Sequence, residues 1–266
     1  MSIRYVDAHC HVQFEPYDTD REALIEQMQG NGVAGIVVGC DFGSSQKAVA
    51  LAEKYPHLYA SIGLHPNSEN EESFEVAAYQ ELAKSHKVVG IGECGLDYFR
   101  PQEVTDELKQ KQKILFRSHI ALAAERGLPL IIHARPSKGT QDAYQDLILI
   151  LQEAKKKYST LTGDIHFFVG GVSEAEALVS LGFTLSFTAV ITFARDYDAV
   201  IRATPLTSIL AETDAPYVAP LGRRGKRNDP LAVIDVVEKI SKIRGEDQQT
   251  VRLALLENTE RIFSLS

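Results

Sequence analysis

Short β-rich runs alternate with longer helix-patterned segments along the whole chain of 266 residues. The predicted strands are Arg4–His9, Gly35–Gly39, Leu58–Ile62, Val88–Gly92, Leu130–His133, Ile165–Phe168, Thr184–Phe187 and Thr207–Glu212. The clearest helical patterns are Asp20–Gln29, Ser44–Lys54, Asp106–Arg126, Ser173–Leu181, Pro230–Arg244 and Gln248–Phe263. Strands that alternate with helices form βαβ units and a parallel sheet. Eight such units predict an α/β fold, the closed (β/α)8 TIM barrel. The competing open, doubly wound sheet is disfavoured because no GxGxxG follows the first predicted strand.

Composition and local sequence exclude several other classes of protein. No linker or low-complexity tract divides the chain, so residues 1–266 are expected to form a single domain. Asp7, His9 and His11 stand where a signal peptide would need an apolar core, and no apolar run approaches the roughly 18 residues of a membrane span. The 3 cysteines have no CxxC spacing and fit small buried side chains in a reducing compartment. We therefore expect a cytoplasmic protein without membrane attachment.

Histidine or carboxylate residues follow six of the predicted strands. These strand ends read His9-Cys10-His11, Gly63-Leu64-His65-Pro66, Gly92-Glu93-Cys94-Gly95-Leu96-Asp97-Tyr98, His133-Ala134-Arg135, His166-Phe167-Phe168 and Glu212-Thr213-Asp214-Ala215-Pro216. In a barrel of this type, functional residues collect at the carboxyl ends of the strands. A single histidine there would usually be a hydrogen-bonded core residue, but six placements at the same end predict a shared site.

The spacing of these residues indicates which side chains point into the barrel. Residues two apart on a strand share a face, so His9 and His11 are expected to point inward and Cys10 outward, with Asp7 below as a supporting acceptor. The same rule predicts three more shared faces, which are Val89 with Ile91 and Glu93, Ile131 with His133, and Glu212 with Asp214. Four histidines and two carboxylates exceed the ligands of one tetrahedral ion. A pair of ions about 3.5–4 Å apart, bridged by a carboxylate, would use them all.

With these residues the chain resembles the TatD family of metal-dependent hydrolases, a branch of the amidohydrolase-like barrels. The resemblance rests on Val6-Asp7-Ala8-His9-Cys10-His11, Gly63-Leu64-His65-Pro66, Ile91-Gly92-Glu93-Cys94-Gly95-Leu96-Asp97-Tyr98, Leu210-Ala211-Glu212-Thr213-Asp214-Ala215-Pro216-Tyr217, Arg224-Gly225-Lys226-Arg227-Asn228-Asp229-Pro230 and Asn258-Thr259-Glu260-Arg261-Ile262-Phe263. An HxH pair alone occurs in many barrel hydrolases, whereas the full set in this order is specific.

The resemblance implies a site with two divalent metal ions (Mg, Mn or Zn) and substrate contacts around them. One ion would be held by His9, His11, Glu93 and Asp214, the second by Glu93, His133 and His166, and the substrate by His65, Asp97 and Arg135. Members of the family are magnesium- or manganese-dependent deoxyribonucleases, including 3′-exonucleases, and some relatives deacylate mischarged transfer RNA. The chain departs from the commoner pattern at Phe167-Phe168-Val169-Gly170-Gly171, after His166, and at Pro136-Ser137-Lys138, after Arg135.

The predicted activity is the hydrolysis of a phosphodiester bond in DNA, with RNA as a second substrate. Two divalent ions would lower the pKa of a bound water from about 15.7 toward about 7 and neutralise the phosphate oxygens. Asp214 is the candidate acceptor of the water's proton, with Glu212 as a second candidate. Glu93 would fix the spacing of the ions, and His65 and Arg135 would donate to the phosphate oxygens.

Two other functions stay open from the sequence. The first is a deacylase or amidohydrolase that uses the same metal site on an ester or C–N bond, such as the ester of aminoacyl-tRNA. The second is a scaffold or metal-binding protein without activity. The complete ligand set disfavours it, because a scaffold does not need six converging ligands. Nothing in the sequence implies a stable protein partner.

One basic cluster contrasts with the formal net charge of -8, and it consists of Arg223, Arg224, Lys226 and Arg227. Because it follows the eighth predicted strand, the cluster is expected at the mouth of the site. There Arg224 and Arg227 would hold substrate phosphates; the alternative is a solvated face. Tyr98, Phe99 and Tyr217 are expected beside the same mouth, where they would either stack on unpaired bases or pack the loops.

Overall fold

Eight parallel strands pair in chain order from β1 to β8 in the computed structural model, which describes residues 3–67 and 73–265. The strands are β1 (Tyr5–Cys10), β2 (Val33–Val38), β3 (Leu58–Ile62), β4 (Val88–Asp97), β5 (Leu130–Arg135), β6 (Gly163–His166), β7 (Phe183–Phe187) and β8 (Ile209–Ala211). A parallel bridge between Cys10 and Ala215, just beyond β8, joins the two edges of the sheet. The predicted (β/α)8 barrel is confirmed.

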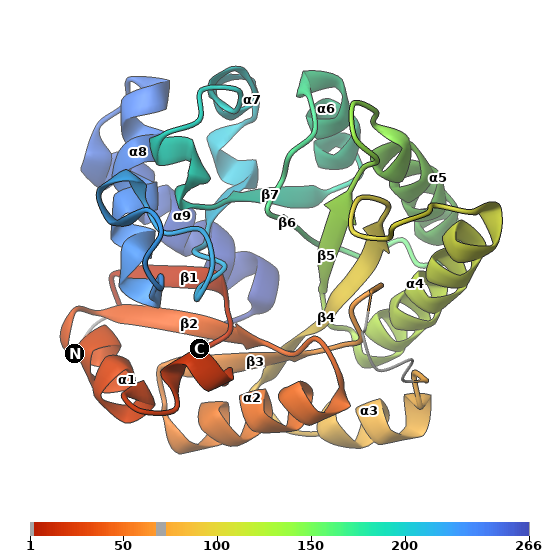
Figure 1. The fold of residues 1–266 in the computed structure, drawn as a ribbon, viewed down its shortest axis with the longest axis horizontal. Coiled ribbons are helices and arrows are strands. Elements are labelled where there is room, and N and C mark those ends of the chain that lie inside the picture. Colours follow the sequence, from red (N-terminus) through yellow and green to blue (C-terminus); the bar gives the residue numbers. More distant parts are fainter. Residues whose placement is uncertain (1–2, 68–72, 266) are drawn as a thin grey trace.

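Helices surround the ring of strands, as Figure 1 shows. The α-helices are α1 (Arg21–Gly30), α2 (Phe42–Lys54), α3 (Val76–Leu82), α4 (Asp106–Arg126), α5 (Asp142–Lys157), α6 (Val172–Ser180), α7 (Asp198–Ala203), α8 (Val233–Arg244) and α9 (Gln248–Phe263). Short 3-10 turns occur at Glu15–Tyr17, Ala189–Thr192, Leu206–Ser208, Leu221–Arg223 and Pro230–Ala232. No helix in the described ranges is both long and apolar enough to cross a membrane.

The bounds of α4 follow directly from its capping residues. The side chain of Thr105 accepts a hydrogen bond from the Leu108 N–H at 3.1 Å and so satisfies one free donor of the first turn. At the other end Gly127 adopts a φ of 65°, a left-handed conformation that glycine reaches without strain. The helix predicted at Asp106–Arg126 is therefore confirmed.

Some predicted element bounds differ from the structure for local reasons. β4 continues beyond Gly92 to Asp97 because this stretch pairs with β5 as far as Arg135. β6 ends at His166, since Phe167 has a φ of 47° and leaves the strand. The helix predicted from Pro230 begins instead with a 3-10 turn, whose first free N–H is capped by Asp229.

The predicted common face of Val89, Ile91 and Glu93 is wrong. Val89 belongs to the apolar cluster inside the barrel, whereas Ile91 packs in the layer between strands and helices. The pairing register of β4 shifts opposite Ala60, and it shifts again between Ile91 and Cys94. An extra residue in a strand reverses the side-chain alternation, so spacing in the sequence misassigned the faces here.

The interior of the barrel is filled by apolar side chains from six strands and from the end of α9. The cluster consists of Ala8, Ile36, Val38, Tyr59, Val89, Ile131, Leu210, Ile262 and Phe263. A Cβ placed on Gly90, near the start of β4, would lie 3.5 Å from Cε1 of Phe263. The end of α9 therefore closes the amino end of the barrel, opposite the polar strand ends.

We predict that Phe263→Ala lowers the free energy of unfolding by about 3–5 kcal/mol, because it leaves a cavity in this floor. Urea denaturation monitored by circular dichroism measures the change. Leu253→Ala, on the same helix but 40% exposed, is the control and should cost less than about 1 kcal/mol. Equal losses in the two variants would contradict the role assigned to Phe263.

Candidate metal centre

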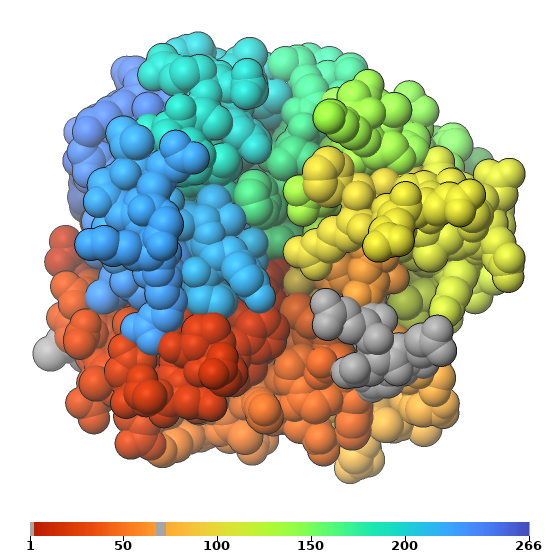
Figure 2. All heavy atoms as spheres, in the orientation of Figure 1, coloured from red at the N-terminus to blue at the C-terminus, as the bar shows by residue number. Residues whose placement is uncertain are grey.

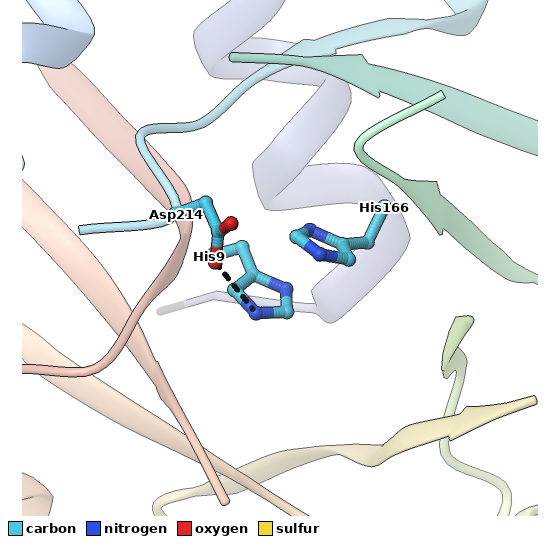
Figure 3. A group of neighbouring side chains, drawn as sticks. All are labelled: His9, His166 and Asp214. Atoms are coloured by element: carbon cyan, nitrogen blue, oxygen red, sulfur yellow. Dashed lines mark ion pairs between the residues drawn. The ribbon is translucent and has the colours of Figure 1, made fainter. Parts of the chain in front are cut away.

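Histidine and carboxylate side chains from six strand ends converge at the carboxyl end of the barrel. The converging residues are His9, His11, His65, Glu93, His133, His166 and Asp214. Figure 3 shows three of them, His9, His166 and Asp214, which reach a common point from three separate segments of the chain. The structure thus brings together all six metal ligands predicted from the sequence.

One group of ligand atoms surrounds the imidazole of His9. Its Nε2 lies 3.1 Å from Nε2 of His11, 3.6 Å from Oε2 of Glu93 and 3.9 Å from Oδ1 of Asp214. Nε2 of His11 lies 3.4 Å from the same Asp214 oxygen. Atoms that bind one divalent ion at about 2.0–2.2 Å lie about 3–3.5 Å from one another. These separations therefore fit a single divalent cation.

The tautomer of His11 suits metal binding. Its Nδ1 lies 2.8 Å from the carbonyl oxygen of Val38, which can only accept, so Nδ1 carries the hydrogen. In the neutral ring, Nε2 then offers a lone pair toward His9 and Asp214. Burial first, and the neighbouring His166 second, lower the pKa of His9 and favour its neutral form. Nδ1 of His9 is buried without a partner in the described part of the chain, so this ring makes its polar contacts through Nε2.

A second group of ligand atoms lies on the other side of Glu93. Oε1 of Glu93 is 3.0 Å from Nδ1 of His133 and 3.7 Å from Nε2 of His166, whereas Oε2 faces His9. The two oxygens of one carboxylate thus serve two separate ligand groups. A carboxylate placed in this way would be able to contact two ions at once.

Two further carboxylates orient the histidines of the second group. Nε2 of His133 lies 3.1 Å from Asp97, and Nδ1 of His166 lies 3.0 Å from Glu212. Each contact fixes one ring nitrogen and leaves the other directed at Glu93, as outer acceptors do around protein-bound metals. Burial alone would raise the pKa of Asp97, but His133 and the N–H groups of Arg100 and Phe99 hold it well below its ordinary value.

The charges of the site call for a cation. Burial opposes ionisation of Glu93, yet the imidazoles of His65, His133 and His9 hold its pKa well below the usual range. Burial also opposes protonation of His166, yet Glu212 and Glu93 raise its pKa to about 10. Crowded buried carboxylates thus draw positive charge to the cluster, and a divalent ion supplies that charge without a proton.

A cavity of about 700 Å³ opens above these ligands. Figure 2 shows the hollow near the centre of this face, where segments from all parts of the sequence meet. Among its walls are five residues that sequence reasoning did not select, namely Phe14, Cys40, Asn67, Arg100 and Tyr197. Cys40, Asn67 and Arg100 follow β2, β3 and β4, but none of the five is a histidine or carboxylate, which were the side chains selected at strand ends.

Cys40 differs from the other two cysteines. Cys10 and Cys94 are fully buried, as expected, whereas Cys40 lines the cavity with its Sγ 3.3 Å from Oε2 of Glu93. Burial first, and Glu93 second, raise the pKa of the Cys40 thiol well above its ordinary value. The thiol therefore stays protonated and donates a hydrogen bond to the carboxylate.

Of the residues expected to contact substrate, His65 and Arg135 line the cavity, and Asp97 does not. Nδ1 of His65 accepts the N–H of Asn67 at 3.1 Å, so in the neutral ring Nε2 carries the hydrogen. Burial lowers the pKa of His65 to about 3, which keeps the ring neutral. Asp97 is buried behind His133, with Oδ1 accepting the N–H groups of Phe99 and Arg100.

The basic cluster is largely engaged outside the cavity. Arg227 pairs with Asp20 and donates to the carbonyl oxygen of Pro16. Arg223 pairs with Asp229 and Asp235. A separate contact places the guanidinium of Arg224 4.4 Å from the centre of the Phe193 ring.

The three aromatic residues expected at the mouth separate into two roles. Tyr98 is buried and donates its hydroxyl to Asp146, so it packs the loop. Phe99 and Tyr217 are 47% and 53% exposed, so neither ring packs the loops as Tyr98 does, and Tyr217 lines the cavity.

Asp7 was expected to accept a hydrogen bond from a histidine ring, but the structure gives it other partners. Its carboxylate accepts the N–H of His9 at 3.3 Å, and it accepts the N–H of Thr213 at 2.8 Å together with that residue's hydroxyl. It therefore holds the segment that carries Asp214 against β1, and it does not contact an imidazole nitrogen.

Comparison with known proteins agrees with this geometry. The model of the TatD related DNase family matches residues 6–264. The uncharacterized metal-dependent hydrolase YabD of Bacillus subtilis is 36% identical over 264 residues, which cover 98% of this chain and 99% of that protein. The chain belongs to the TatD family of metal-dependent hydrolases.

Two further relatives are a protein of known structure and an exonuclease. The crystal structure of the TatD homolog YjjV from Escherichia coli superposes with a TM-score of 0.88 at 31% identity, over 100% of both chains. The 3′-5′ ssDNA/RNA exonuclease TatD of Pectobacterium parmentieri is 30% identical over 260 residues, which cover 94% of this chain and 95% of that protein.

We predict that His11→Ala weakens the binding of Mn²⁺ to this TatD-family protein at least tenfold, because it removes a lone pair aimed at the ion. Isothermal titration calorimetry measures the affinity, and circular dichroism checks that the barrel stays folded. His86→Ala, which removes an exposed histidine, is the matched control and should bind Mn²⁺ like the wild type. Unchanged affinity in His11→Ala would remove this residue from the ligand set.

We predict that Glu93→Gln removes more bound metal than any single histidine substitution in the centre. Its two oxygens face both ligand groups, and an amide lacks the negative charge that a cation needs. Mass spectrometry of the metal retained per chain after dialysis provides the comparison with His11→Ala and His133→Ala. If Glu93→Gln retained as much metal as these two variants, Glu93 would not be shared.

Proposed function

We propose that this protein hydrolyses phosphodiester bonds of nucleic acids with a pair of divalent ions held on either side of Glu93. The observation that carries the proposal is the division of the Glu93 oxygens between two ligand groups beneath an open cavity. The name of the matching family, TatD related DNase, and that of the exonuclease relative support a nucleic-acid substrate.

Divalent ions held by these residues would lower the pKa of a water molecule toward about 7 and would neutralise charge on the phosphate. Asp214 is the residue we assign as acceptor of the water's proton. Burial opposes its ionisation, but the neighbouring imidazoles of His11, His166 and His9 lower its pKa and keep the carboxylate ionised. Glu212 is less suited, because it already accepts hydrogen bonds from His166, Ser186 and the N–H of Phe167.

His65 is the proposed donor to the oxygens of the phosphate being cleaved, and Arg135 is a proposed donor to substrate phosphate from the cavity wall. The Nε2–H of His65 lies 3.6 Å from Glu93, too far for a strong hydrogen bond, so it is available to a ligand. Arg135 borders the same cavity from the end of β5. Donors fixed by the fold before the substrate arrives stabilise developing charge at little cost in reorganisation.

The size of the cavity favours a strand end over a duplex. About 700 Å³ lies within the range of small-ligand sites, which span about 300–1,000 Å³. A double helix is too wide to enter such a space, whereas an unpaired end can enter. We therefore propose exonucleolytic cleavage of single strands, DNA first and RNA second.

The test uses protein loaded with Mg²⁺ or Mn²⁺ and three substrates, which are single-stranded DNA, blunt duplex DNA and aminoacyl-tRNA. We expect nucleotides to be released from single-stranded DNA at least tenfold faster than from the duplex. We also expect Asp214→Asn to abolish this release. Deacylation of the tRNA with both DNAs left intact would overturn the proposal in favour of an ester hydrolase.

The free cations of the basic cluster should add weak phosphate contacts near the mouth. Arg224 and Lys226 make no ion pair within residues 3–67 and 73–265, whereas Arg223 and Arg227 are paired. We predict that Arg224→Gln with Lys226→Gln flattens the log–log salt dependence of oligothymidylate binding by about 1.4, at about 0.7 per contact. Fluorescence anisotropy at several salt concentrations measures the slope. An unaltered slope would leave the cluster as a solvated face.

A further inference from the structure

We propose that Arg100 and Arg135 form a second phosphate subsite beside the metal centre, which binds the phosphate next to the one being cleaved. The inference rests on the proposed phosphodiesterase function and names the preferred substrate, a strand in which the scissile phosphate has a phosphorylated neighbour. No sequence motif identified Arg100 as a substrate-binding residue. It is included because it lines the cavity.

Arg135 has no carboxylate partner among residues 3–67 and 73–265. It ends β5 in register with Asp97, and its carbonyl oxygen accepts the N–H of Tyr98 at 2.8 Å, so its backbone is fixed. Its guanidinium lies 4.0 Å from the centre of the Phe99 ring. No ion pair joins it to any residue that the structure describes. Stacking on an aromatic face leaves the N–H edges of a guanidinium free for a phosphate.

Arg100 reaches the same cavity from the loop that follows β4. Its side chain is 57% exposed, and Nε lies 3.7 Å from Oδ2 of Asp97. That oxygen also lies 3.1 Å from Nε2 of His133, and Oδ1 accepts two backbone N–H groups. Asp97 is thus shared among several donors, and it neutralises Arg100 only in part.

The two arginines stand beside the metal ligands and not among them. The ring of His133 lies between Glu93 and Asp97, with Nδ1 facing the first carboxylate and Nε2 the second. Arg100 is therefore separated from the metal centre by one imidazole. A diester phosphate carries a single negative charge, which the metal centre itself can neutralise. Two additional cations one side chain away fit a neighbouring phosphate.

The experiment compares three dinucleotides, which are dithymidine monophosphate and its forms with an added 5′-phosphate or an added 3′-phosphate. The quantity measured is the ratio of kcat/KM with and without the added phosphate, determined separately for each protein. Because it is taken within one protein, any effect of a substitution on the shared bond cleavage cancels. We expect a ratio of at least 10 for one of the two added phosphates in the wild type.

In Arg135→Gln and in Arg100→Gln this ratio should fall at least threefold, and in the double variant it should approach 1. Arg135→Lys, which keeps the charge but loses the fork of donors, should retain part of the preference. Arg117→Gln is the matched control. It removes one positive charge from an arginine of α4 that pairs with Glu153 on α5, and it should keep the wild-type ratio.

The subsite proposal would be overturned if the wild-type ratio were near 1 for both the 5′-phosphate and the 3′-phosphate. It would also be overturned if the ratio were unchanged in both arginine variants. An equal gain from a terminal carboxymethyl group in place of the phosphate would overturn its assignment to phosphate. Failure of the proposed function gives a different result, because none of the three dinucleotides would then be cleaved. In that case calorimetric affinities for the same compounds report on the subsite, with the same expected ratios.

Discussion

Glu93 carries a buried negative charge in the middle of the barrel mouth, and such a charge is stable only when partners surround it. His9, His65, His133 and His166 lie within 3.0–3.7 Å of its two oxygens, and each comes from a different strand or strand end. Outer acceptors then hold the second nitrogen of His133 and of His166. The arrangement of the histidines and of their outer acceptors thus follows from the need to compensate the charge of Glu93. A cation from solution would add to this compensation.

The hydrogen bonds that close the barrel also assemble this centre. The N–H of Asp214 donates to the carbonyl oxygen of His9 at 2.9 Å, and the N–H of His11 donates to that of Ala215 at 2.7 Å. Asp7 adds its contacts to Thr213 on the same seam. Ligands from the first and last strands are therefore brought together by the pairing that completes the sheet, so the centre cannot form on an open sheet.

The sequence predicted the barrel, and it predicted that six candidate ligands converge at one end of it, because both expectations follow from rules that act at short range. His9 and His11 follow strict alternation at a strand end, and β-rich runs between helical patterns imply parallel pairing. The prediction failed where strand register or a partner distant in the sequence determines the position of a side chain. A shift in the pairing of β4 separates Ile91 from Val89. Arg227 pairs with Asp20, and no local pattern reveals a partner at the other end of the chain. Arg100 is placed by the backbone contacts of Asp97, which the sequence does not display.

The floor made by Ile262 and Phe263 has a consequence for how the chain folds during synthesis. Both residues belong to the last helix, yet they pack with Ala8, Val89 and Ile131 inside the barrel. A ribosome releases the strands before α9, so the nascent barrel stays open at its base until α9 has emerged. Contacts between such distant parts of a chain are slow to form, and the apolar interior is exposed meanwhile. The metal-binding face, made largely by earlier strands, therefore waits for the final helix before its scaffold is sealed.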